Sequence, residues 1–173
     1  MKQLCIGLLV LALVLLPACG SSPESPAGTE GGILSHFQTT DLEGNAVDES
    51  IFSGYQLTMV NIWATFCTPC ISEMPELAGL AETYAPKGVQ IVGLISDGDS
   101  ETELAKSIVA ETGANYQHLL PSADLENLLS QVYAVPTTIF VDESGRQVGS
   151  TYLSAKTREE WAEIIDRVLA SLG

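Results

Sequence analysis

The stretch VNIWATFCTPC at residues 60–70 decides the fold of this 173-residue chain. It begins inside an apolar, β-branched run at residues 57–63, which predicts a buried strand. Residues 68–84 then carry apolar side chains at helical spacing, which predicts a helix directly after the strand. The two cysteines, Cys67 and Cys70, are therefore expected at the point where that helix begins.

This placement of the cysteine pair favours redox chemistry. The free N–H groups and the positive dipole end of a helix stabilise a thiolate at its N-terminus. The C-x-x-C spacing brings Cys70 back to Cys67 within one turn, and Pro69 fits the first turn, where its missing N–H is not needed. We expect Cys67 to be the exposed attacking sulfur and Cys70 the buried sulfur that resolves the mixed disulfide. Half of a metal site and an inert pair are the alternatives.

The rest of the chain predicts alternating strands and helices. The expected elements are a hairpin of residues 37–41 and 46–48, a helical turn at 49–52, a strand at 89–96, a helix from a cap at Asp99 or Ser100 to Thr112, a short strand at 117–120, a helix at 123–132, a hairpin of 137–141 and 147–153, and a last helix from Thr157 to Leu172. This order indicates an α/β three-layer sandwich with a mixed central sheet and an N-terminal β-hairpin extension.

The sequence around the cysteines resembles the TlpA/ResA-type branch of the thioredoxin family. Typical members read VNFWATWC-x-PC and then Glu-x-Pro, and this chain has residues 60–70 as quoted, followed by Glu73-Met74-Pro75. The resemblance runs from about residue 37 to the C-terminus and departs at Phe66, where the family usually has Trp. It implies a thioredoxin-like fold and a thiol-disulfide oxidoreductase that reduces protein disulfides. The redox-active Cys67–Cys70 disulfide would then be its only redox group, with no further cofactor and no metal.

The segment YAVPTT at residues 133–138 resembles the cis-proline loop of this family. A cis bond before Pro136 would turn the Val135 backbone toward the disulfide, where it could pair with an extended substrate segment. Phe66, Thr68, Pro69 and Val135 are the expected substrate contacts. The alternative is an ordinary trans proline at the start of a strand.

Glu73 follows Cys70 by three residues and is expected about one turn along the same helix. Its counterpart in the family is an active-site acid, so a carboxylate here could carry the proton to or from Cys70. Asn61 stands where thioredoxin itself has a buried Asp, which makes Glu73 the leading acid. A solvated surface glutamate is the alternative.

The N-terminus predicts export and lipidation. Residues 1–18 have one early positive charge and an apolar run too short to cross the ~30 Å hydrocarbon core, which is typical of a signal peptide. The run ends in LPACG, which resembles a bacterial lipobox whose Cys19 is lipidated. Residues 19–32 are then a flexible tether and residues 33–173 the thioredoxin-like domain. The alternatives are an ordinary cleaved signal and an uncleaved anchor.

Composition excludes several classes of protein. With 22 acidic and 7 basic side chains the chain carries a formal charge of −15, which repels nucleic acid. Cys5 would leave with the signal peptide and Cys19 would carry lipid, so the mature domain keeps only Cys67 and Cys70. Neither a structural disulfide framework nor a four-cysteine zinc site can be built from that pair.

The charges near the cysteines predict the direction of electron flow. No Lys, Arg or His lies between Asn61 and Pro86, while three glutamates of the expected helix would oppose a thiolate. We therefore expect a moderately lowered pKa of Cys67 and a potential nearer to that of thioredoxin (≈ −270 mV) than to that of DsbA (≈ −120 mV).

The resemblance also implies partners. The expected protein is a monomeric lipoprotein on the extracytoplasmic face of the cell membrane. Its electrons would come from a membrane thiol carrier and go to protein disulfides such as those of apocytochrome c or a methionine sulfoxide reductase. One alternative is a peroxiredoxin-like thiol peroxidase, which would want Thr where this chain has Ala64. Another is a Sco-type copper chaperone, which would want a wider cysteine spacing and a well-placed histidine, whereas His36 and His118 are expected at the surface or in loops.

Overall fold

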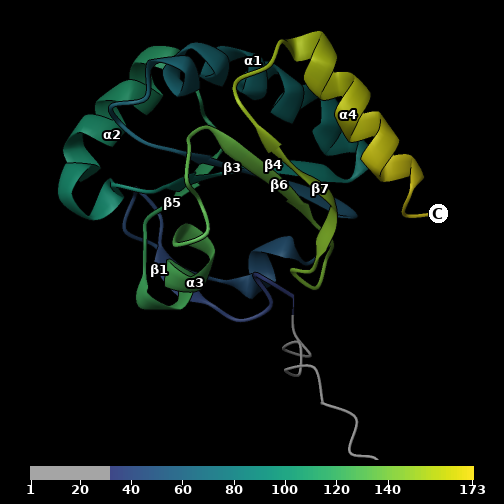
Figure 1. Cartoon of the computed structure of the whole chain (residues 1–173), viewed down its shortest axis with the longest axis horizontal. Helices are drawn as coiled ribbons and strands as arrows, with labels where there is room; N and C mark the ends of the chain where they lie inside the picture. The colour runs from purple at the N-terminus through teal and green to yellow at the C-terminus, as the bar shows by residue number, and fades with distance from the viewer. Residues whose placement is uncertain (1–31) are drawn as a thin grey trace, which may run out of the picture. The chain divides into compact units, whose positions relative to one another are not determined.

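A computed structural model describes residues 32–173; residues 1–31, with the expected signal peptide, Cys19 and nearly all of the expected tether, lie outside the described residues. Five strands form one mixed sheet in the order β5-β4-β3-β6-β7 (Figure 1). They are β3 (Leu57–Trp63), β4 (Val89–Ile95), β5 (Gln117–Leu119), β6 (Thr137–Val141) and β7 (Gln147–Leu153). Strand β3 lies at the centre, parallel to β4 and antiparallel to β6, and every one of its residues is buried.

Helices cover one face of this sheet (Figure 1). Helices α1 (Thr68–Tyr84) and α4 (Arg158–Ala170) pack on β3, β4 and β6 through a core that includes Leu77, Phe140 and Trp161. Helix α2 (Gly98–Thr112) packs beside α1 and completes a smaller core around the two cysteines.

The opposite face carries the N-terminal elements and the helical segment of residues 123–129 (Figure 1). These are a separate two-stranded sheet of β1 (Gln38–Thr40) and β2 (Ala46–Asp48), the 3-10 helix η1 (Glu49–Phe52), the 3-10 helix η3 (Ala123–Leu125) and α3 (Glu126–Leu129). Their apolar side chains share a core with Val60, Val92 and Ile139 of the sheet. The three-layer sandwich with a mixed sheet and an N-terminal hairpin is therefore confirmed.

Most expected elements form at the expected residues, and two differ. Helix 123–132 is wrong in length, because regular helix ends at Leu129. Gln131 and Val132 donate to the carbonyls of Leu128 and Leu129, three residues back, so the chain tightens into turns after Leu129. The cap of α2 is also wrong, because the helix begins at Gly98 and Asp97 occupies the cap position. Gly113 ends α2 as expected, in the left-handed conformation at φ 67°.

Within residues 32–173 none of the helices is both long enough and apolar enough to cross a bilayer.

Candidate active site

The two cysteines form a disulfide at the N-terminus of α1. Their Cα atoms lie 5.3 Å apart, and Cys67 occupies the cap position of the helix. The Cys70 N–H donates a hydrogen bond to Cys67 Sγ at 3.2 Å. After reduction the same N–H, with the positive end of the helix dipole, would stabilise a Cys67 thiolate. The backbone of the first turn is therefore arranged to activate this sulfur.

Cys67 is less exposed than the sequence suggested. It is 5 % exposed and Cys70 is 1 % exposed, because both pack into the core formed with Trp63, Ala64 and other residues of this region. The small exposed fraction lies on Cys67, between the exposed side chains of Phe66, Thr68 and Pro69. Of the two cysteines, Cys67 therefore offers the greater access to a partner thiol or disulfide.

The sheet register brings the proline loop to the cysteine loop. Ile62 of β3 pairs with Thr137 of β6 in an antiparallel ladder, so Pro136 lies beside Trp63, where the chain leaves β3 toward Cys67. The Val135–Pro136 peptide bond is cis, as expected. Val135 packs against the core that contains both cysteines.

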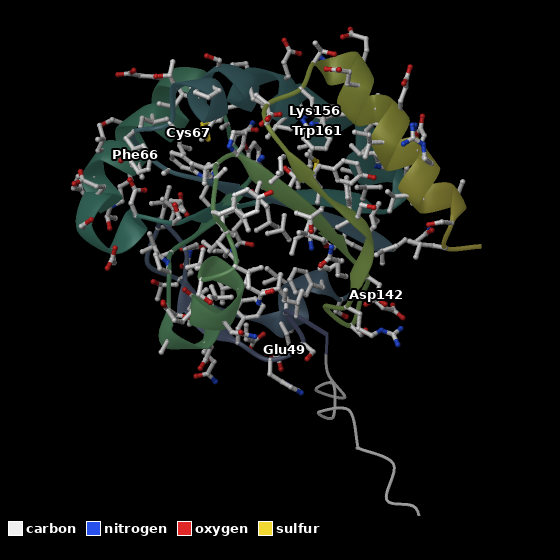
Figure 2. All side chains as sticks on the ribbon, viewed as in Figure 1. Glu49, Phe66, Cys67, Asp142, Lys156 and Trp161 are labelled. Atoms are coloured by element: carbon white, nitrogen blue, oxygen red, sulfur yellow. A yellow bond between two sulfur atoms is a disulfide. The ribbon has the colours of Figure 1, made fainter. Side chains whose placement is uncertain are left out.

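A groove of about 430 Å³ is lined by Phe66, the residue before Cys67, and by Val135 of the proline loop. Tyr133, which sequence reasoning missed, lines the same groove and is 81 % exposed; Phe66 is 77 % exposed. Figure 2 shows Phe66 and Cys67 at the same end of the molecule. Pro69 lies on a second groove on the side of α4, described below. Phe66 was an expected substrate contact, so the addition is Tyr133, a second exposed aromatic ring on the groove that Phe66 lines.

Glu73 is buried rather than solvated, so the surface alternative is wrong. It is 3 % exposed, and its Oε1 accepts hydrogen bonds from the backbone N–H of Lys156 at 2.8 Å and from the indole N–H of Trp161. Among residues 32–173, its Oε2 has only a long contact of 3.5 Å from the Asn61 amide. Burial raises the pKa of Glu73 above its ordinary value, against the opposing effect of these hydrogen bonds.

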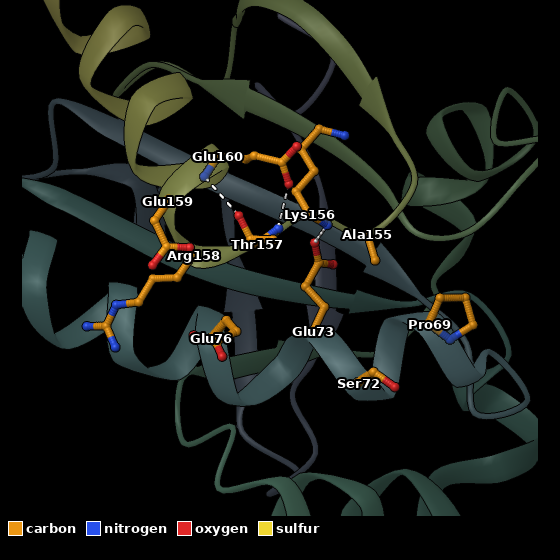
Figure 3. Close-up of a pocket in the computed structure, with 10 residues that line it drawn as sticks. All are labelled: Pro69, Ser72, Glu73, Glu76, Ala155, Lys156, Thr157, Arg158, Glu159 and Glu160. Carbon is orange, nitrogen blue, oxygen red and sulfur yellow. Dashed lines mark hydrogen bonds between the residues drawn. The ribbon is translucent and has the colours of Figure 1, made fainter.

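The second groove, of about 620 Å³, opens beside Glu73 (Figure 3). Helix α1 contributes Ser72 and Glu76 to its wall, and the start of α4 contributes the opposite wall. The Glu73 side chain points across it to the Lys156 backbone (Figure 3). Glu73 is thus a buried acid next to the cysteine pair, with a groove close to it.

Asp97 holds the loop between β3 and the cysteines, a role that sequence reasoning missed. Its two carboxylate oxygens each accept the Thr65 N–H at 3.1 Å, and Oδ2 accepts the Thr65 hydroxyl at 2.7 Å. Because the side chain is used in this way, it makes no capping bond to α2. These hydrogen bonds join Asp97 to a residue 32 positions earlier in the chain. Thr65 itself lies two residues before Cys67.

His118 is 2 % exposed, so its expected surface placement is wrong. Its Nδ1 accepts the Trp63 indole N–H at 3.2 Å and its Nε2 lies 2.9 Å from the Ala114 carbonyl, which requires the proton on Nε2. Burial lowers the pKa of His118 to about 4, so the ring is neutral at physiological pH. The ring fits because residue 93 is Gly; a Cβ there would collide with it.

Neither histidine is placed to serve the cysteines as a metal ligand. Both ring nitrogens of His118 are engaged, and His36 pairs with Glu49 at 3.4 Å by the N-terminal hairpin. Over residues 32–173 no group of three or more His, Cys, Asp or Glu side chains is arranged to hold a metal ion.

Comparison with known proteins agrees with this geometry. The family model described as Redoxin matches residues 23–165. A thiol-disulfide oxidoreductase ResA of Bacillus thuringiensis subsp. konkukian is 31 % identical over 138 residues, which cover 77 % of this chain and 75 % of the relative. A second ResA, of Geobacillus kaustophilus, is 28 % identical over 94 % of this chain and 92 % of the relative.

The fold also matches solved structures. A thiol:disulfide interchange protein of the thioredoxin family from Chlorobium tepidum TLS superimposes with a TM-score of 0.68 at 20 % identity, covering 83 % of this chain and 99 % of that one. At this identity the likeness supports the fold alone.

Proposed function

The chain belongs to the Redoxin family, in its TlpA/ResA-type branch, and we propose that it is an extracytoplasmic reductase of protein disulfides. It is a thiol-disulfide oxidoreductase, and its substrates are protein disulfides in general. The observation that carries this function is the Cys67–Cys70 disulfide at the start of α1, framed by exposed side chains.

In the proposed reaction the reduced pair transfers two electrons to the client. The Cys67 thiolate attacks one sulfur of the client disulfide, forms a mixed disulfide and releases the first client thiolate, which takes a proton from water. Cys70 loses its proton to Glu73 and attacks Cys67 Sγ, which releases the second client thiolate and restores the Cys67–Cys70 disulfide. A thiol electron donor then reduces the pair for the next turnover.

The acidic surroundings support reduction as the net direction. A strongly oxidising pair needs a strongly stabilised thiolate, but the segment from Asn61 to Pro86 has no cationic side chain. Glu73 lies one turn from Cys70, and Asp97 binds the loop that leads to Cys67. Both carboxylates oppose a negative charge on the pair.

We expect a reduction potential near that of thioredoxin, about −270 mV. A titration of the Cys67–Cys70 pair against glutathione or dithiothreitol buffers, read by thiol alkylation and mass spectrometry, measures it. A value above about −180 mV would place the pair among the oxidants and contradict the proposed direction.

The proposed location is supported by the sequence of residues 1–32 rather than by the described structure. Residues 1–18 serve as the signal peptide, Cys19 carries the lipid, and residues 19–32 link it to the domain at 33–173. The proposed clients, apocytochrome c or a methionine sulfoxide reductase, the membrane thiol donor and the monomeric state follow from the family resemblance.

Replacement of Cys19 by serine is expected to move the protein from the membrane to the soluble fraction. The lipid on Cys19 is the proposed anchor, and serine does not carry it. Fractionation followed by immunoblotting measures the shift, and the Cys5→Ser variant is the matched control that stays in the membrane. Membrane retention of both variants would show that the lipid is not the anchor.

A further inference from the structure

The two oxygens of the Glu73 carboxylate have unequal partners. Oε1 accepts two hydrogen bonds, from the Lys156 N–H and the Trp161 indole N–H. Within the described part of the chain, Oε2 has only the contact of 3.5 Å from Asn61. An oxygen with two donors is a poor proton acceptor, because its lone pairs are already engaged. Oε2 is therefore the oxygen that can accept a proton.

Both donors come from one rigid turn at the start of α4. Thr157 caps the helix, and its capping box with Glu160 fixes the backbone between Lys156 and Trp161. The Trp161 ring is fully buried and packs edge-on against Phe140 and Tyr152 at centroid distances of 6.4 and 5.9 Å. Lys156 and Trp161 lie close together in Figure 2. Glu73 is thus positioned by a segment 83 to 88 residues away in the chain.

We propose that Trp161 is a positioning residue of the disulfide exchange reaction: its indole N–H fixes Oε1 of Glu73 and leaves Oε2 to accept the Cys70 proton. This inference rests on the proposed function. It adds to the reaction a residue that lies outside the cysteine motif and the proline loop. The electron balance of the reaction is unchanged, because Glu73 only holds the proton while Cys70 attacks Cys67.

Other charged and titratable groups face Glu73. The Lys156 ammonium lies 5.2 Å from the centroid of the Trp161 ring and donates to the carbonyls of Leu153 and Ser154. The buried hydroxyl of Tyr116 has no hydrogen-bond partner among the described residues, and burial together with the Glu73 charge raises its pKa. Four more charged side chains line the groove beside Glu73, namely Glu76, Arg158, Glu159 and Glu160.

These neighbours change little in a Trp161→Phe variant, which keeps an aromatic ring in the same core. The variant removes one donor that favours the charged carboxylate, so the pKa of Glu73 rises further. A protonated Glu73 cannot accept the Cys70 proton. The acid limb of kcat/KM for insulin reduction should therefore move to higher pH, by about one unit for the loss of one charge-assisted hydrogen bond.

The matched control is Phe140→Leu, which disturbs the same aromatic core but removes no hydrogen bond to Glu73. It should leave the acid limb where it is in the wild type. In a Glu73→Gln background, Trp161→Phe should cause no further shift, since the group that titrates is gone. An equal shift in Phe140→Leu, or no shift in Trp161→Phe, would overturn the proposal.

A second measurement tests the proposal on the protein with Trp161 in place, in case the Trp161→Phe variant does not fold. The chain has two tryptophans, so the oxidised protein should give two indole N–H resonances by NMR. The cysteines do not titrate in this form. The resonance that belongs to Trp161 should titrate with an apparent pKa above the ordinary 4.5 of Glu, and Glu73→Gln should abolish that titration.

A Trp161 resonance that does not respond to pH, or that responds equally in Glu73→Gln, would overturn the proposal. The indole titration needs no catalysis, so it remains informative if the wild type fails to reduce insulin. Such a failure would count against the proposed function alone.

Discussion

Replacement of Cys67 by alanine is expected to abolish insulin reduction by dithiothreitol beyond the background rate of the thiol itself. Cys67 is the more exposed cysteine of the pair, at 5 % against 1 %, and it occupies the cap position, where the helix N-terminus stabilises the thiolate. The only other cysteine within residues 32–173 is Cys70, which is 1 % exposed and poorly placed to attack a client. The expected loss is roughly 10³-fold or more, as for removal of a covalent nucleophile. Insulin turbidity or a fluorescent disulfide substrate measures it.

The Cys70→Ala variant is the matched control for this loss. Both variants lack the disulfide, so any effect on stability through the missing bond is common to them. Cys70→Ala keeps the attacking sulfur and should still react once with a client disulfide. Multiple turnovers by Cys67→Ala would contradict the assignment of Cys67 as the nucleophile.

Replacement of Glu73 by glutamine is the second large effect and should lower kcat/KM for disulfide reduction roughly 10²-fold, the size of a lost general base. Gln keeps an oxygen for the Trp161 and Lys156 donors but cannot accept a proton. The acid limb that Glu73 contributes to the pH profile should disappear in the variant. Stopped-flow measurement of client reduction across the pH range tests both points.

The same variant should not lose stability at neutral pH. Folding raises the pKa of Glu73, so the folded protein binds this proton more tightly than the unfolded chain does. The stability contributed by the group is therefore present below its unfolded pKa and falls as the pH rises through the folded pKa. Glu73→Gln removes this cost, and its denaturation midpoint at neutral pH should be unchanged or higher.

Glu76→Gln is the matched control, because Glu76 is exposed and lies three residues along the same helix. It makes the same change in net charge near the cysteines without touching the buried carboxylate. Its activity should stay close to wild type. An equal loss in both variants would show that net charge, rather than the buried Glu73, controls the rate.

Local signals were sufficient for the elements that carry the cysteines. The apolar run of β3 and the helical spacing of α1 meet at the cysteine pair, and each pattern is complete within its own segment. The cap at Thr157 and the stop at Gly113 were equally visible, because each depends on residues within one turn. The cis bond before Pro136 was expected from the family resemblance, not from the residue pattern.

Contacts between distant segments were not visible in the sequence. The spacing of α4 shows that Trp161 faces inward, but not that its N–H meets Glu73 across 88 residues. Asp97 looks like one of several acidic residues at a helix start until the fold brings Thr65 to it. The sequence near His118 does not show that its ring is buried, because the space for the ring is left by Gly93 on the neighbouring strand. Such pairs depend on sheet order and register, which no local pattern reports.

The most direct test of the central claim is to trap the mixed disulfide. Reduced Cys70→Ala protein is mixed with oxidised insulin, quenched by alkylation and analysed by mass spectrometry, with Cys67→Ala treated in parallel. We expect an insulin chain joined through a disulfide to the peptide that contains Cys67, and no adduct in the Cys67→Ala protein. An adduct formed through Cys70 in that protein, or no adduct in either, would contradict the claim that Cys67 attacks clients and Cys70 resolves them.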